Sequence, residues 1–208
     1  MLEIYRIIHR DNLDYILRSG RVVAPNHPDA DPNYVAIGNN EIIARRSNRS
    51  IPVSRSRTFR DYVAFYFGYR SIMLYNIHTG FGEVERCDQS NIIYLVYDAH
   101  QLVDAGYDFF FTDGQGNQGN TRFFDRMEDI DQVDLSAAHA TDFSTEAQKK
   151  DPDIKRKKHA EFHVYGEIDL DYLLYIAVCN EEARRKVLET ANRRGHNITI
   201  SIKPEFYY

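Results

Sequence analysis

The chain is poor in the residues and motifs that mark several large protein classes. It contains no Trp and only two Cys, Cys87 and Cys179, which lie in no CxxC or Cys/His spacing. A disulfide framework and a zinc site are therefore not predicted. No apolar run approaches the ~18 residues of a membrane-spanning helix, and the start, MLEIYRIIHRDNL, is too charged for a signal peptide. We expect a cytoplasmic protein with no membrane anchor and no bound metal.

Common nucleotide-binding and hydrolase signatures are also missing. No GxGxxG follows a predicted strand, and no P-loop, HExxH or GxSxG occurs. These absences argue against a Rossmann nucleotide site and against the enzyme classes that the other motifs define. No segment has the composition of a linker, so we expect a single domain over residues 1–208, present as a monomer.

The net charge of −5 argues against a surface made for indiscriminate nucleic-acid binding, but the charge is unevenly distributed. Residues 44–60 hold six Arg and no acid, whereas residues 125–146 hold seven acidic residues and one Arg. A basic stripe on an acidic protein fits a local phosphate or nucleic-acid groove. It fits an ordinary solvated loop equally well.

Short helices are predicted between strands that are spread through the whole chain. The expected strands are residues 3–8, 61–67, 91–98, 109–112, 162–165, 172–178 and 198–202. The expected helices are residues 11–20, 41–49, 72–78, 99–105, 121–138 and 181–193, with a charged helix or coil at 142–158. Residues 51–60 and the glycine-bearing residues 113–120 are expected as loops, the latter too flexible to pack. Regular βαβ units are absent, which indicates an α+β fold with mixed or antiparallel central sheets and short peripheral helices.

The segment KRKKHAEFHVYGEI carries the most suggestive arrangement. A basic run leads directly into a strand that has Glu161 at its entrance. Side chains alternate across a strand, so Glu161, His163 and Tyr165 are expected on one face, and Phe162 and Val164 on the other. A carboxylate in this position can act as a general base or stabilise a developing cation. The competing interpretation is a surface Glu screened by neighbouring lysines.

Four segments, in this order, resemble the motifs of the DarT family of DNA ADP-ribosyltransferase toxins. They are IYRIIHRDNLDYILRSG, IGNNEIIARRSNRSIPV, DYVAFYFGYRSIMLYNIHTG and KRKKHAEFHVYG, and FFFTDGQGN and the terminal FYY extend the resemblance over nearly the whole chain. The resemblance implies the ADP-ribosyltransferase fold, with NAD+ as substrate. It implies transfer of ADP-ribose to a base of single-stranded DNA, most often thymine N3. It also implies a macrodomain antitoxin, DarG, as partner.

The resemblance further implies roles for individual residues. The Glu of the RxAEF motif falls on Glu161 and the second Arg of the ERR motif on Arg46, which makes both catalytic. The implied NAD+-binding positions are Arg6, His9, Asn12, Tyr66, Ser71, Leu74 and Tyr75. The candidates for DNA contact are Arg55, Arg57, Arg60, Gln115, Asn117, Lys157 and Tyr165, because single strands are bound by basic grooves with stacking aromatic rings. The chain departs from the family pattern at Arg60, Ala64 and Gln115, where target preference can be set.

The residue types suit this chemistry, although each has an ordinary structural alternative. A carboxylate at Glu161 can hold a ribose hydroxyl as the sugar becomes cationic, and can accept the thymine N3 proton. Arg46 offers a planar fork of donors for a phosphate or a base carbonyl, but also fits a solvated helix position. Arg6 fits a pyrophosphate or an internal salt bridge, and His9 an NAD+ contact or a cap.

The functional alternatives are the same fold acting on guanine, RNA or protein, and a non-catalytic single-stranded nucleic-acid-binding module. The carboxylate of Glu161 favours an enzyme, because binding an anionic strand gains nothing from a buried negative charge.

Overall fold

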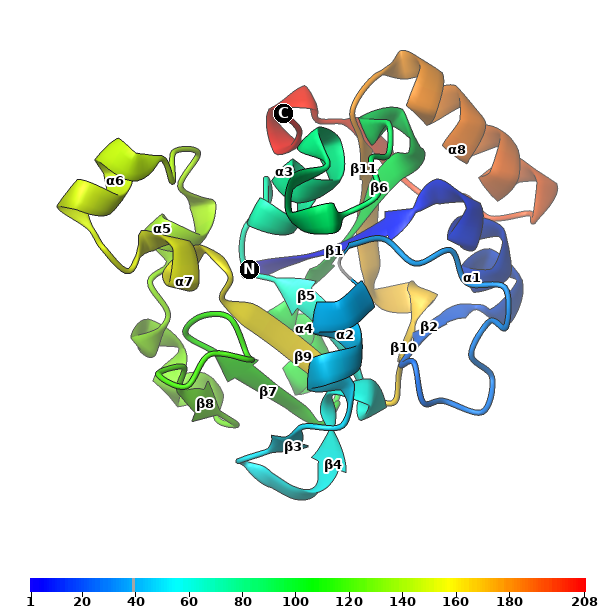
Figure 1. The fold of residues 1–208 in the computed structure, drawn as a ribbon. Coiled ribbons are helices and arrows are strands. Elements are labelled where there is room, and N and C mark those ends of the chain that lie inside the picture. The colour runs from blue at the N-terminus through cyan, green and yellow to red at the C-terminus, as the bar shows by residue number, and fades with distance from the viewer. Residues whose placement is uncertain (39) are drawn as a thin grey trace.

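One eight-stranded sheet organises the structure, a computed structural model that describes residues 1–38 and 40–208 apart from the side chains of residues 40, 42, 45, 54–56 and 83 (Figure 1). The strand order is β12-β11-β6-β1-β5-β9-β7-β8, and neighbours are antiparallel except the parallel pair β11 and β12. The strands are β1 Glu3–His9, β5 Tyr62–Tyr66, β6 Ile92–Asp98, β7 Phe109–Thr112, β8 Phe123–Phe124, β9 Glu161–Tyr165, β11 Leu173–Val178 and β12 Ile200–Ile202. The predicted α+β class with a mixed sheet is confirmed.

Two small ribbons and short helices complete the fold. The ribbons pair β10 Glu167–Asp169 with β2 Arg21–Val23, and β3 Ser50–Ile51 with β4 Ser54–Thr58. The helices are α1 Leu13–Ser19, α2 Asn40–Ser47, α3 Ile72–Thr79, α4 Ala99–Asp104, α5 Leu135–His139, α6 Thr145–Lys150, α7 Ile154–Lys158 and α8 Glu181–Arg193. No helix in the described part of the chain is both long and apolar enough to cross a membrane.

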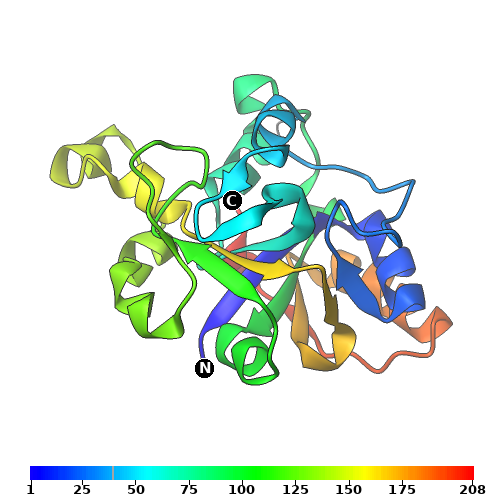
Figure 2. The same cartoon turned by 90° about the horizontal axis from the view of Figure 1, so that it is seen from below.

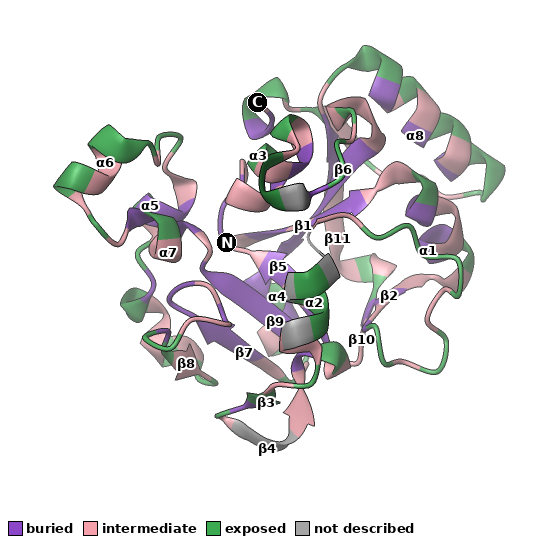
Figure 3. Ribbon diagram, in the orientation of Figure 1, coloured by how far each residue is buried: buried purple, intermediate pink, exposed green. Residues whose placement is uncertain are grey.

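Each face of the sheet packs against its own apolar cluster. On one face, alternate residues of the central strands, such as Ile4, Phe65 and Phe162, pack with residues of α1, α4 and α8. On the other face, α3 and the C-terminal segment cover a second cluster that includes Tyr5 and Tyr94. The view from below shows α2 and α3 on the same side of the sheet (Figure 2). The burial colours show central strands such as β9 and β7 as mostly buried (Figure 3).

The central strand β1 pairs much more extensively with β6 than with β5. β1 and β6 pair along their full length, from Glu3 opposite Asp98 to His9 opposite Ile92. β1 and β5, by contrast, share one register pair among the described residues, Tyr5 opposite Tyr66. The sheet therefore opens between β1 and β5, next to the strand that carries Glu161.

Two predictions about secondary structure are wrong. The expected helix at 121–138 is instead β8, a 3-10 helix Met127–Gln132 and α5, because β8 pairs with the edge of β7. The expected loop at 51–60 contains β4 and a 3-10 helix, Phe59–Asp61.

The glycine-bearing loop 113–120 is packed rather than free. The Thr121 hydroxyl donates to the Gln115 carbonyl at 2.7 Å, and Gly114 and Gly116 are buried. Gly116 lies so close to Phe59 and Glu161 that a Cβ there would lie 2.8 Å from the Phe59 ring and 3.0 Å from Glu161 Oε2. Glycine in this loop therefore permits a close approach between backbone and side chains.

Candidate active site

Glu161 begins β9 in the buried interior of the sheet. It lies opposite Tyr66 of β5, and its backbone N–H donates to the Thr112 hydroxyl of β7 at 3.2 Å. The strand alternates as predicted: Phe162 and Val164 enter the core shared with α1 and α8, and Glu161 and His163 contact each other on the opposite face. The Glu161 side chain is only 4% exposed, so the interpretation of a surface Glu screened by lysines is wrong.

Arg46 of α2 is the ionic partner of Glu161. Its Nη1 donates to Glu161 Oε1 at 2.8 Å, and its guanidinium lies over the Phe59 ring, 4.6 Å from the centroid. The Arg46 side chain is 18% exposed, which excludes the interpretation of a solvated helix residue. Figure 1 shows why the two meet: α2 crosses in front of β5 and β9. The structure thus joins two residues that are 115 positions apart in the sequence.

His163 contacts the other oxygen of the same carboxylate. Its Nε2 lies 3.2 Å from Glu161 Oε2, and the residue has no exposed surface. Burial raises the pKa of Glu161, but the charge of Arg46 and the hydrogen bond from His163 outweigh burial and lower that pKa to about 2. Burial also lowers the pKa of His163. The group therefore consists of an ionised carboxylate held between a guanidinium and a neutral imidazole.

The turn between β5 and α3 places four of the predicted NAD+-binding residues. Ser71 caps α3 by accepting a hydrogen bond from the Leu74 N–H at 3.2 Å, and Leu74 is fully buried. The Tyr66 hydroxyl donates to Met73 Sδ at 3.7 Å, and burial raises the pKa of Tyr66. Tyr75 lies further out, 37% exposed, with its ring edge-on to those of Phe143 and Tyr208.

Two more of the predicted NAD+-binding residues, Arg6 and Asn12, lie in a different place, beside α1 and β2. Arg6 Nη1 donates to the Ala64 carbonyl at 3.0 Å, across the opening between β1 and β5, while its buried Nε has no hydrogen-bond partner. No ionic partner of Arg6 is found among the described residues, so the internal salt bridge is not seen there. Arg6 and Asn12 line a cavity of about 180 Å³, and both atoms of the Asn12 amide bind the Val35 backbone, at 2.9 and 2.8 Å.

His9 makes a capping hydrogen bond and also lines a second cavity, which is larger than the one beside Arg6. Its Nδ1 accepts a hydrogen bond from the Asp11 N–H at 3.3 Å, which fits the capping alternative. His9 also lines a cavity of about 470 Å³ together with Gly38, Ile77 and Arg86. This cavity lies beside α3, on the side of the sheet where Glu161 lies.

The residues predicted to contact DNA come from several segments and differ in exposure and in partners. Arg57 donates to Asp108 at 3.0 Å and stacks over the Tyr165 ring at 3.6 Å, and Arg60 is exposed. Gln115 accepts from Gln118 at 3.1 Å. The buried Oδ1 of Asn117 has no partner in the part of the chain that is described. The side chain of Arg55 lies outside the described residues.

The basic run before Glu161 is largely engaged with other parts of the chain. Lys157 lies 2.8 Å from Asp151 and 3.3 Å from Asp134. Arg156 pairs with Asp113 at 2.7 Å. Lys158 is buried, with its ammonium near the carbonyls of Tyr69 and Ala138 at 3.5 and 3.3 Å. Some of these partners are local, such as Asp151, whereas Asp113, Asp134 and the carbonyls of Tyr69 and Ala138 come from distant segments that a local pattern does not record.

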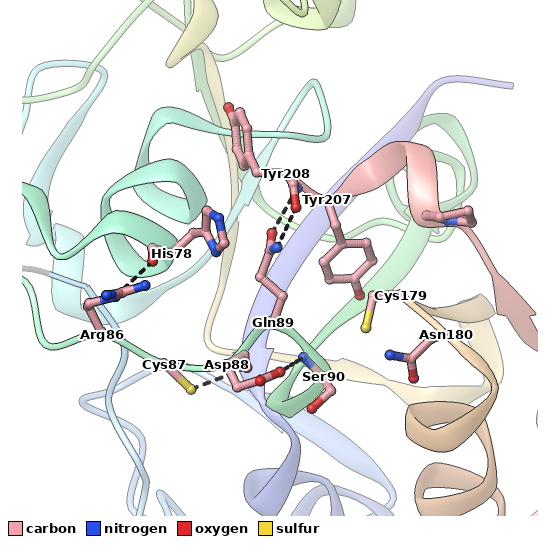
Figure 4. Close-up of a pocket in the computed structure, with 11 residues that line it drawn as sticks. His78, Arg86, Cys87, Asp88, Gln89, Ser90, Cys179, Asn180, Tyr207 and Tyr208 are labelled. Carbon is pink, nitrogen blue, oxygen red and sulfur yellow. Dashed lines mark hydrogen bonds between the residues drawn. The ribbon is translucent and has the colours of Figure 1, made fainter.

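A separate hollow of about 490 Å³ lies at the C-terminal end of the fold and contains no predicted site residue (Figure 4). Gln89 holds the last residue, Tyr208, through both amide atoms, at 2.6 and 2.8 Å. Both cysteines line this hollow, and both are free thiols. Most of its polar side chains are already bound to neighbouring backbone, so the perturbed carboxylate at Glu161 is the stronger candidate for chemistry.

Comparison with known proteins identifies the family of the chain. The family profile described as "ssDNA thymidine ADP-ribosyltransferase, DarT" matches residues 5–208. The DNA ADP-ribosyl transferase of Thermus sp. strain 2.9 is 33% identical over 99% of this chain and 95% of its own length. The enzyme of the same description from Escherichia coli O127:H6 is 30% identical, over 99% of this chain and 93% of its own.

Solved structures show the same fold. Thermus sp. 2.9 DarT in complex with ADP-ribosylated ssDNA superposes with a TM-score of 0.89 at 32% identity, covering 100% of this chain and 96% of that one. The complex of the same Thermus protein with NAD+ gives 0.84 at 32% identity, covering 100% and 98%. Thermosipho africanus DarTG in complex with ADP-ribose shares the fold at 20% identity, with a TM-score of 0.78 over 100% of this chain and 51% of that one. The chain therefore belongs to the DarT family and is an NAD+-dependent DNA ADP-ribosyltransferase.

Proposed function

We propose that the chain transfers ADP-ribose from NAD+ to N3 of thymine in single-stranded DNA, with Glu161 and Arg46 as the catalytic residues. The observation that carries the proposal is the buried pair of Arg46 and Glu161, at 2.8 Å, in the open part of the sheet beside β1 and β5. A buried carboxylate with a strongly lowered pKa and a specific charged partner is typical of a functional site.

The reaction breaks one bond to the anomeric carbon of the ribose and forms another. Nicotinamide leaves with the electron pair of the glycosidic bond, and the N3 lone pair of the base attacks the same carbon. The N3 proton passes to the carboxylate of Glu161, which also stabilises the positive charge on the ribose before attack. Nothing is oxidised or reduced in this exchange.

Arg46 controls how basic Glu161 is. While the two are paired, the pKa of Glu161 stays at about 2, and such a carboxylate is a weak proton acceptor. When Arg46 turns to the carbonyl of the incoming base or to a phosphate, Glu161 loses its counter-charge in a buried place, and its affinity for a proton rises. Proton abstraction is thereby coupled to arrival of the DNA.

The cofactor is proposed to lie along β1 and the start of α3. The nicotinamide end lies near Tyr66, Ser71 and Leu74, with Tyr75 at its outer edge. His9 faces the 470 Å³ cavity on this side of the sheet. Arg6, which has no ionic partner among the described residues, supplies charge for the pyrophosphate, and Asn12 holds the adjoining loop at Val35. The Thermus DarT complex with NAD+ supports this class of ligand.

The DNA strand is proposed to follow the rim from the glycine-bearing loop to the Arg57 and Tyr165 pair. Tyr165 is 41% exposed and carries the Arg57 guanidinium on its face, so both can stack on bases. Arg60 and Lys157 offer charge to phosphates, while Gln115 and Asn117 offer hydrogen bonds to base edges. Arg55 belongs to the same basic segment.

The biological role is proposed to be that of the toxin in a toxin–antitoxin pair, acting in the cytoplasm and countered by a DarG macrodomain. The likeness in fold to Thermosipho africanus DarTG, solved with ADP-ribose, supports this pairing. Removal of ADP-ribose from DNA is the chemistry such a partner must supply.

Four oligonucleotides that differ only in one central base test the target. Each is incubated with NAD+, and the mass of the DNA is measured. We expect the mass of one ADP-ribose to be added only to the thymine strand, and Glu161→Ala to abolish the addition while the protein stays folded. If mass is added only to the strand with guanine, the target base is guanine and the assignment to thymine is wrong. A gain on protein or RNA and on no DNA strand would refute it.

A further inference from the structure

The two oxygens of the Glu161 carboxylate have different neighbours. Oε1 accepts from Arg46 at 2.8 Å, and Oε2 lies 3.2 Å from His163 Nε2. A Cβ on Gly116 would lie 3.0 Å from Oε2, so the loop backbone closes that side. Oε1 is therefore the oxygen that becomes available when Arg46 moves, and Oε2 is enclosed by protein.

The His163 ring is held in one orientation by aromatic side chains. It stacks on Phe110, with centroids 4.3 Å apart and planes 5° from parallel, and Phe59 lies edge-on at 5.3 Å. Tyr62 is also edge-on, at 6.5 Å. With no exposed surface, the imidazole has little freedom to rotate. The carboxylate oxygen therefore meets a donor in a fixed position.

The surroundings of the ring select one tautomer. Nε2 faces an ionised carboxylate, whereas the buried Nδ1 has no hydrogen-bond partner in the described part of the chain. With its proton on Nε2, the ring donates a hydrogen bond to the Glu161 carboxylate. A proton on Nδ1 would instead leave a buried donor unpaired and set a lone pair against an anion. Burial, helped by the charges of Arg46 and Arg6, lowers the pKa of His163 and outweighs the hydrogen bond and charge of Glu161, which raise it, so the doubly protonated ring is disfavoured.

We propose that His163 is a positioning residue for this reaction: as the neutral Nε2–H tautomer it fixes Oε2 of Glu161, so that Oε1 faces the ribose and the target base. The inference rests on the proposed role of Glu161. His163 neither contacts substrate nor accepts the proton, because its second nitrogen is buried without a partner to pass a proton on. Its effect is on the orientation of the carboxylate.

Kinetics of three variants test this role. His163→Leu removes the donor at similar volume, and kcat for transfer should fall roughly 10- to 100-fold, with the KM for NAD+ within about twofold of wild type. His163→Gln can bring an amide N–H to the place of Nε2 and should retain kcat within about fivefold. His100→Leu removes a half-exposed histidine beside Asp98 and is the matched control, with no change expected. A wild-type kcat for His163→Leu would overturn the proposal, as would an equal loss in a folded His163→Gln.

Nitrogen NMR of the wild-type protein supplies a readout that needs no turnover. The His163 ring should show a neutral imidazole with the proton on Nε2, and its Nε2 signal should shift in Glu161→Gln. A proton on Nδ1, or a charged ring at neutral pH, would overturn the proposal even where both His163 variants fail to fold. If the wild type modifies no DNA at all, the proposed function fails, and this spectrum still decides how His163 and Glu161 are coupled.

Discussion

At the scale of single residues, the site is defined by how one carboxylate is enclosed. Burial alone would raise the pKa of Glu161, and only the nearby Arg46 and His163 reverse that effect. A buried ion pair is costly to desolvate and stabilises a protein little for its cost. The pair is therefore weak evidence for stability, which fits the catalytic role proposed for it.

Gly116 offers a test of how tightly this carboxylate is packed. An alanine there would place its Cβ 2.8 Å from Phe59 and 3.0 Å from Glu161 Oε2, so the ring and the carboxylate must both shift. We expect Gly116→Ala to lower kcat at least about tenfold, since small displacements of reacting groups are costly. Gly119→Ala, in the same loop, meets nothing within 4 Å and should leave kcat within about twofold. Equal rates for the two variants would show that this close approach does not matter.

At the scale of elements, the segment before Glu161 acts as a structural clamp. Lys158, at the end of α7, lies between the carbonyls of Ala138, in α5, and Tyr69, in the turn that leads to α3. Arg156 and Lys157 bind Asp113, Asp151 and Asp134 in the same region. The basic run therefore joins α5, α7 and the glycine-bearing loop to the strand that carries Glu161.

Lys158 should make stability depend on pH. Burial lowers its pKa from 10.5 to about 8, so between these values the unfolded chain holds a proton that the folded chain has lost. Stability contributed through this group therefore rises with pH across that window. Melting temperatures measured from pH 7.5 to 10 should show this rise in wild type and not in Lys158→Met. The exposed Lys155→Met is the control and should keep this rise, and a Lys158→Met profile that parallels wild type would contradict the lowered pKa of Lys158.

At the scale of the whole molecule, an acidic protein is proposed to bind an acidic polymer. With a net charge of −5, attraction must come from a local surface and not from the overall field. Among the described basic side chains of the 44–60 segment, Arg60 is exposed and fits that surface, whereas most of the 155–158 run has internal partners.

The salt dependence of DNA binding measures how many phosphate contacts the basic side chains make. Affinity for a short single strand should fall as salt rises, with a log–log slope of about −0.7 for each phosphate contact. Arg60→Ala should make that slope shallower by about this amount. Arg126→Ala is the matched control. It also removes an exposed Arg, which lies beside Glu128 outside the 44–60 segment, and it should leave the slope unchanged. Identical slopes for Arg60→Ala and wild type would remove Arg60 from the DNA path.

Many local features of the fold were predictable because their physical causes are local. Period-two alternation identified β9 and put Glu161 and His163 on one face, and Gly20 marked the end of the helix predicted at 11–20. The region 121–138 was mistaken for helix because β8 exists only through pairing with β7, a contact that no local pattern records. The loop 113–120 was judged too flexible for a similar reason, since its glycines reflect close packing against distant side chains.

The sequence by itself determined which strand carries the acid, which face that acid occupies and, through a resemblance spread over the whole chain, which family the chain belongs to. Only the tertiary structure decided that Arg46 meets Oε1 of Glu161, that His163 takes Oε2, and that Lys157 and Lys158 turn inward. Alternation and capping act over a few residues and can be read along the chain. Ion pairs and buried donors are chosen by the packing of elements far apart in sequence.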